Sequence, residues 1–152
     1  MKRYVLLAGV LIAAVSYTAL ASARPAARKA SGATVEVFET LYGSKILVDS
    51  SGFTVYEFSK DSKKKDHCVK ISGCPEVWPP LQASGPPTAG PGVNAALLST
   101  ITLPSGASQV TYAGHPLYTH PADPGPGETY YFKVKEFKGI WYGLDPAGKK
   151  LK

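Results

Sequence analysis

Apolar and polar residues alternate along several short stretches of the chain. The segment 34–38, Thr-Val-Glu-Val-Phe, is the clearest case, and a period of two places successive side chains on opposite faces of a β-strand. No segment keeps the helical period over three turns. The pattern predicts an all-β fold with strands at 34–38, 45–48, 53–58, 100–103, 108–112, 115–120, 130–134 and 140–144.

Turn-forming residues separate these segments. Asp-Ser-Ser-Gly at 49–52 and Pro-Ser-Gly at 104–106 each lie between two predicted strands, which indicates two β-hairpins. Proline and glycine are so frequent in 79–92 that neither a regular strand nor a helix is expected there. Asn94 is suited to cap one helical turn over 94–98.

The chain contains two similar halves. The pairs that match after a shift of 62 or 63 positions are Val48 and Val110, Gly52 and Gly114, Tyr56 and Tyr118, Asp61 and Asp123, Trp78 and Trp141, Leu81 and Leu144, and Gly85 and Gly148. We therefore expect a single β domain at 34–152. It is built from two degenerate tandem repeats of about 62 residues, at 34–92 and 93–152, and the second packs on the first.

The first 23 residues have the composition of a secretory signal peptide. Lys2 and Arg3 precede the apolar segment 4–20, and Ala-Ser-Ala at 21–23 is an A-x-A cleavage site. An uncleaved anchor is the alternative, although 17 residues are at the short limit for a membrane span. We expect a flexible leader at 24–33 and an exported protein, periplasmic or extracellular, that does not span the membrane after cleavage.

The positive charge is modest and is concentrated in one loop. The chain has 17 basic and 11 acidic residues, and removing the signal segment leaves 15 and 11, a net charge of +4. With no nucleic-acid motif, this charge argues against a nucleic-acid partner. Lys60, Lys63, Lys64 and Lys65 predict a solvated loop, with weak contact to an anionic surface as the alternative.

The two cysteines, Cys68 and Cys74, lie close together in the sequence. In an exported chain they are expected to form a disulfide. So short a loop gives about 2 kcal/mol in the chain-entropy model, so the bond shapes its loop more than it stabilises the fold. A metal or redox site that uses both sulfurs and His67 is the alternative.

A tyrosine precedes an aspartate by five positions in each half. The two sets of motif residues are Tyr56, Phe58 and Asp61, and Tyr118, His120 and Asp123. In the structural interpretation, each aspartate caps backbone N–H groups where its own strand ends. In the functional interpretation, each set binds a cation or a polar ligand.

The histidines make a poor set of metal ligands. His115 and His120 are five positions apart, so a strand places them on opposite faces. His120 and Asp123 form a two-ligand fragment. We expect no bound metal and no cofactor.

The aromatic residues favour a core. Trp78 and Trp141 recur at equivalent positions and are expected to fill the interior of the repeats. A groove for sugars or peptides is the alternative. Its other residues would be Tyr118, Tyr130, Tyr131 and Tyr142.

Three pieces of the sequence together resemble a family of small bacterial secreted proteins and lipoproteins. These pieces are LVDSSGFTVYEFSKD, the C-x5-C loop followed by PEVWPPL, and QVTYAGHPLY. The family is described as a secreted repeat of unknown function and by its Y-x-(F/W/Y)-x-x-D motif. His120 departs from the aromatic position of that motif, and the signal lacks a lipid-attachment cysteine, which indicates a soluble exported form. The resemblance implies export and no particular activity.

No catalytic motif is present in the sequence. Serine-hydrolase, zinc-protease, P-loop and dinucleotide-binding signatures are all missing. We expect a non-enzymatic envelope or extracellular binding module of unknown ligand. The alternatives are a metal- or haem-associated redox accessory protein of the envelope, which would use tyrosine, histidine and aspartate side chains, and a secreted hydrolase with an aromatic groove.

Overall fold

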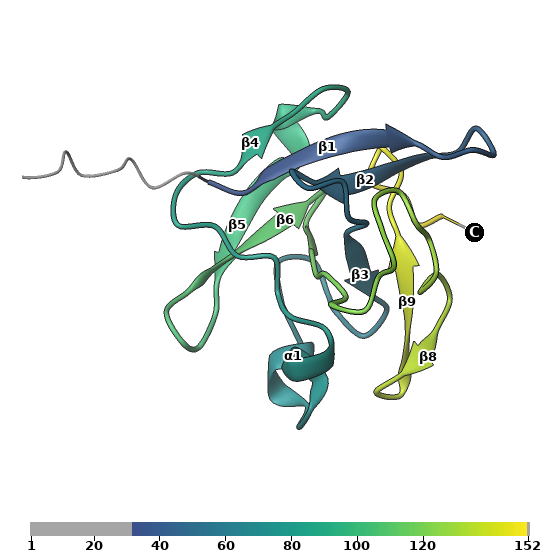
Figure 1. Ribbon diagram of the computed structural model, residues 1–152. Coiled ribbons are helices and arrows are strands. Elements are labelled where there is room, and N and C mark those ends of the chain that lie inside the picture. The colour runs from purple at the N-terminus through teal and green to yellow at the C-terminus, as the bar shows by residue number, and fades with distance from the viewer. Residues whose placement is uncertain (1–31, 152) are drawn as a thin grey trace, which may run out of the picture.

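The computed structural model describes residues 32–151, so the predicted signal peptide and most of the predicted leader lie outside the described residues. The elements are β1 (Thr34–Glu39), β2 (Lys45–Asp49), β3 (Tyr56–Phe58), η1 (Cys68–Lys70), α1 (Cys74–Val77), β4 (Thr88–Ala89), η2 (Ala95–Leu97), β5 (Leu98–Thr102), β6 (Ser108–Tyr112), β7 (His115–Pro116), β8 (Lys135–Glu136) and β9 (Gly139–Gly143). Strands dominate and helix is scarce (Figure 1), which confirms the all-β prediction.

The strands form three small sheets with the orders β2-β1-β4, β3-β9-β8 and β5-β6-β7. β1 and β2 are antiparallel, with Val35 opposite Asp49 and Glu39 opposite Lys45. Backbone hydrogen bonds also join the sheets. The N–H of Leu47 in β2 donates to the carbonyl of Leu144, just after β9, at 3.0 Å. The N–H of Tyr118, just after β7, donates to the carbonyl of Tyr56 in β3 at 2.9 Å, so the three sheets form one connected framework.

Two apolar clusters fill the interior. The first takes residues from β1, β2 and β6 and consists of Val35, Leu47, Val55, Ala83, Val110, Tyr112, Leu117 and Leu144. The second, called here the aromatic cluster, consists of Tyr56, Phe58, Cys68, Cys74, Trp78, Tyr118 and Trp141. All seven of its members are fully buried, so most of the motif aromatics lie inside the molecule.

Three local predictions are confirmed. The second predicted hairpin is β5–β6. Asn94 precedes η2, and its Oδ1 accepts a hydrogen bond from the N–H of Ala96 at 3.0 Å. Cys68 and Cys74 form a disulfide that joins η1 to α1.

The first predicted hairpin forms around the 49–52 turn but is short. The N–H of Asp49 donates to the carbonyl of Phe53 at 2.8 Å, the N–H of Val55 donates to the carbonyl of Leu47 at 3.1 Å, and Val48 and Thr54 form a β-bridge. Asp49 closes the turn, because its Oδ1 accepts from the N–H groups of Ser51 at 2.8 Å and Phe53 at 3.1 Å. From Tyr56 onward the chain leaves β2, and β3 pairs with β9 instead.

Several segments differ from the predicted strands. The segment 130–134 forms turns, with Lys133 at φ 60°. The segment 115–120 is strand only at β7 and then forms an isolated bridge between Tyr118 and Tyr56. The proline-rich 79–92 contains β4, since the two residues between Pro87 and Gly90 suffice to pair with β1. The sequence analysis also missed α1 and β8.

Candidate functional site

The two motif tyrosines meet at the centre of the aromatic cluster. The N–H of Tyr56 donates to the carbonyl of Tyr118, and the N–H of Tyr118 donates to the carbonyl of Tyr56, both at 2.9 Å. Both tyrosines are fully buried. An antiparallel β-bridge thus pairs these two residues, which are 62 positions apart in the sequence.

The tyrosine of each motif binds the aspartate of the other. The hydroxyl of Tyr56 donates to both carboxylate oxygens of Asp123 at 3.0 Å. The hydroxyl of Tyr118 donates to Oδ2 of Asp61 at 2.7 Å. We call these two contacts the crossed pairs. They join segments that are far apart in the sequence.

These contacts correct the expectation that each aspartate caps the end of its own strand. Asp61 Oδ1 accepts one backbone N–H, that of His67 at 2.8 Å, which belongs to the lysine-rich loop. The partner of Asp123 is the hydroxyl of Tyr56. The sequence shows the repeated spacing, but it does not show that a tyrosine ring reaches across to the other half.

Burial raises the pKa of both aspartates. The pKa of Asp61 rises to about 7, because burial outweighs the hydrogen bonds from His67 and Tyr118. Burial likewise raises the pKa of Asp123 to about 6, against the opposing hydrogen bond from Tyr56. Burial and the facing carboxylates raise the pKa of both tyrosines above its ordinary value, so both phenols are neutral donors.

The aromatic rings form a stacked column. Trp78 and Trp141 lie face to face with centroids 3.9 Å apart. Phe58 stacks on the other face of Trp141 at 4.3 Å, and the ring of His120 meets Trp78 edge-on at 4.5 Å. Tyr131 then stacks on His120 at 3.5 Å. Because Trp78, Trp141 and Tyr118 are fully buried, they fill the core as predicted, and the alternative of an aromatic groove is wrong for these three residues.

The two equivalent motif positions, Phe58 and His120, differ in their surroundings. Phe58 is fully buried, whereas His120 is partly exposed and its Nδ1 accepts from the N–H of Ala122 at 3.2 Å. Burial against the aromatic rings lowers the pKa of His120, with a smaller opposing effect from Glu136. The imidazole is therefore neutral at pH 7.

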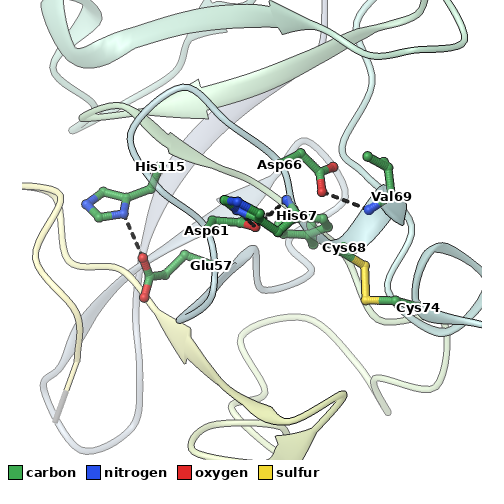
Figure 2. A network of polar contacts seen from close by, with 9 residues as sticks. Glu57, Asp61, Asp66, His67, Cys68, Val69, Cys74 and His115 are labelled. Atoms are coloured by element: carbon green, nitrogen blue, oxygen red, sulfur yellow. Dashed lines mark hydrogen bonds and ion pairs between the residues drawn. A yellow bond between two sulfur atoms is a disulfide. The ribbon is translucent and has the colours of Figure 1, made fainter. Parts of the chain in front are cut away.

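The sequence analysis missed a buried ion pair. Glu57 lies in β3, and its side chain is 2% exposed. Its carboxylate contacts His115 Nδ1 at 2.7 Å, visible in Figure 2, and Lys150 Nζ at 2.6 Å. Burial alone would raise the pKa of Glu57, but these two partners lower it. The available signal was a carboxylate inside the apolar run 53–58.

The candidate metal ligands do not come together. His115 contacts Glu57, and His120 stacks on Tyr131. Asp123 contacts Tyr56. Within residues 32–151, no group of three or more His, Cys, Asp or Glu side chains is arranged to hold a metal ion.

The β1–β2 hairpin ends in exposed apolar side chains. Leu41 and Tyr42 are fully exposed at its tip, and Phe38 is partly exposed beside them. The hairpin projects from the body of the molecule (Figure 1). Next to it lies a cavity of about 460 Å³, whose wall includes Phe132 and Leu151. The sequence signal, which we missed, was an apolar pair in a turn where polar residues are usual.

Comparison with known proteins gives one match. A sequence model of a protein family, described as a secreted repeat of unknown function, matches residues 37–82. This segment is similar to that family. It contains the first motif and the disulfide, and both the match and the disulfide support export. No curated protein and no solved structure matches the chain. In the described part of the chain, no helix has the length and apolar character needed to cross a bilayer.

Proposed function

We propose that this protein is an exported, non-enzymatic binding module of the cell envelope or the extracellular space. The observation that carries the proposal is the exposed apolar tip formed by Leu41 and Tyr42. The aromatic and carboxylate side chains of the motifs, in contrast, contact one another inside the fold. The aromatic and carboxylate side chains of the motifs thus stabilise the fold, and the tip remains exposed for contact with a partner.

We also propose that the domain consists of two degenerate copies of one repeat. The crossed pairs and the tyrosine bridge support this, because each contact has a counterpart in the other half. The turn glycines Gly52 and Gly114 both adopt φ 84°, and each carbonyl accepts a backbone N–H from the other half, that of Gly127 at 2.8 Å and that of Lys64 at 2.7 Å.

The hairpin tip is suited to an apolar partner. An exposed apolar side chain gains about 1.5–3 kcal/mol when it is fully buried, so Leu41 and Tyr42 together provide enough free energy for a weak contact. A Cβ added at Gly43, which adopts φ 75°, would meet no other atom within 4 Å, so the tip is open to an approaching surface.

The test compares the wild-type protein with the double variant Leu41→Ser, Tyr42→Ser in co-sedimentation with envelope material of the source cells. We expect the double variant to lose most of the bound fraction. Val77→Ser is the matched control, because Val77 is exposed and apolar but lies in α1. Equal retention of the double variant, the control and the wild type would refute the proposed contact surface.

Among the described residues, no contact supports the alternative of a metal- or haem-associated redox accessory protein. It would depend on His120 and Asp123, whose contacts are with an aromatic stack and a tyrosine hydroxyl. We therefore propose no metal, haem or other cofactor. Stoichiometric copper, zinc or iron in protein from its native compartment would reverse this choice.

A further inference from the structure

A basic cleft lies beside the β8–β9 hairpin, on a surface separate from the β1–β2 tip. It has a volume of about 460 Å³, and its wall includes Ser59, Lys60, Lys135, Phe137, Lys138 and Ile140. Lys60 reaches the cleft because β3 pairs with β9. Two hydrogen bonds between Ser59 and Ile140, at 2.9 Å and 2.7 Å, fix this side of the cleft.

The cleft concentrates positive charge. Lys60, Lys135 and Lys138 come together there from segments far apart in the chain. The ion pairs formed within residues 32–151 use other cations. Glu136 is the acidic residue of the wall, and its Oε2 accepts from the indole N–H of Trp78 at 2.7 Å. Converging lysines raise the local potential and attract an anion.

The turn between β8 and β9 is strained. Phe137 and Lys138 adopt φ 52° and 60°, as a two-residue hairpin turn of this type requires, although asparagine and glycine are the usual residues there. Phe137 packs against the aromatic cluster, which explains its presence. Lys138 is exposed and belongs to neither core cluster. The turn places Lys138 on the wall of the cleft.

We infer that this cleft binds a phosphate group. Lysine ammonium groups bind phosphate as point charges, and three lysines line the cleft. Phe137 and Ile140 add an apolar wall, which accommodates the apolar or sugar portion that carries the phosphate. A phosphate-bearing envelope polymer and a phospholipid headgroup share this chemistry.

The test is calorimetric titration of the full-length protein with tripolyphosphate at about 0.15 M ionic strength, where exposed charges more than about 8 Å apart are largely screened. The triple variant Lys60→Gln, Lys135→Gln, Lys138→Gln should lose about tenfold or more in affinity, since each exposed contact contributes several-fold. The matched control is Lys63→Gln, Lys64→Gln, Lys65→Gln, which removes the same charge from an exposed loop and should lose no more than about twofold. Equal loss in both triple variants, or no saturable binding to wild-type protein, would overturn the inference.

Two further variants separate binding from folding. Lys138→Gly relieves the strained φ, so its melting temperature should equal or exceed that of the wild type while its affinity falls about threefold. Unchanged affinity would count against the cleft. The variant with Leu41→Ser and Tyr42→Ser should bind tripolyphosphate normally, so this result is independent of the proposed contact at the tip.

Vesicles identify the source of the phosphate. Phosphatidylglycerol vesicles that bind the wild type but not the cleft triple variant, with phosphatidylcholine vesicles as the blank, would assign a lipid headgroup. Binding of tripolyphosphate without binding to either vesicle would assign a soluble or polymeric phosphate.

Discussion

The two crossed pairs have the same chemistry in different surroundings. Asp61 accepts from both Tyr118 and the N–H of His67, and its side chain is 2% exposed. Asp123 accepts from Tyr56, and its pKa is about 6 against about 7 for Asp61. Burial raises both pKa values, and the carboxylates of Asp66 and Glu57 add to the increase at Asp61, so the surroundings set how each carboxyl group titrates.

The column of rings shows the same asymmetry. On one side Phe58 stacks on Trp141, and on the other His120 meets Trp78 edge-on. Trp78 donates its indole N–H to Glu136 at 2.7 Å, whereas the buried indole N–H of Trp141 has no acceptor among the described residues. The Phe58 end of the column is therefore more apolar and more deeply buried than the His120 end.

The largest expected effect comes from the tryptophans. Trp78→Ala and Trp141→Ala should each lower the free energy of unfolding by about 3–5 kcal/mol, because each removes a fully buried ring from the stack. Urea unfolding followed by circular dichroism measures this. A neutral result for either residue would contradict the packed column.

Double-mutant cycles test whether the pairs are crossed. Tyr118 with Asp61 and Tyr56 with Asp123 should each show a coupling of about 0.5–3 kcal/mol when tyrosine is changed to Phe and aspartate to Ala. The pairs within one motif, Tyr56 with Asp61 and Tyr118 with Asp123, serve as controls with weak coupling. Stronger coupling within a motif than between motifs would restore the capping interpretation.

The pH dependence of stability separates the two aspartates. The pKa of Asp61 is about 7 in the folded protein and 3.8 in the unfolded reference. Between these values the folded state keeps a proton that the unfolded chain has released, so stability falls as the pH rises. One group contributes at most about 1.4 kcal/mol per pH unit.

Between pH 6 and 7 the change in stability comes mainly from Asp61, because the pKa of Asp123 is about 6. Asp61→Asn should remove most of the slope there, and Asp123→Asn should remove about half of the slope below pH 6, because Asp61 contributes below pH 6 as well. Urea unfolding at pH 5, 6, 7 and 8 measures both. Measurements that start at pH 5 exclude a contribution from Glu57, because its pKa is lowered and its effect on stability lies below its reference value of 4.5. His120 contributes a slope of opposite sign below pH 6.5, because its pKa is lowered. The comparison is therefore made in the His120→Phe background, where a flat profile would rule out burial as the dominant influence.

The smallest expected effect concerns the position at which the motifs differ. His120→Phe should stabilise the protein by up to about 1 kcal/mol, because a phenyl ring keeps the contact with Trp78 without a buried imidazole. Phe58→His should destabilise it by more than this, because Phe58 is fully buried. Thermal unfolding of the two variants compares them, and equal effects would mean that the two surroundings are equivalent.

Much of the local structure could be predicted from the sequence. The period of two identified β1, β2, β5, β6 and β9, and the cysteine spacing identified the disulfide. These features depend on residues close together in the chain, for which side-chain alternation and turn chemistry are sufficient guides.

The missed features of the buried interior involve distant partners. Glu57 would be an unfavourable buried charge in isolation, and only the approach of His115 and Lys150 makes it acceptable. The segment 130–134 has the composition of a strand, but Tyr131 is held by stacking on His120. In such cases tertiary contacts override the local preference.

The sequence by itself determined the strand-rich fold, the disulfide and the repeated spacing of tyrosine and aspartate. Only the tertiary structure decided that Tyr56 binds Asp123 and Tyr118 binds Asp61. The physical reason is that a hydroxyl and a carboxylate can pair at any separation along the chain. Which of them meet depends on the antiparallel bridge between Tyr56 and Tyr118, which places each ring beside the other motif's aspartate.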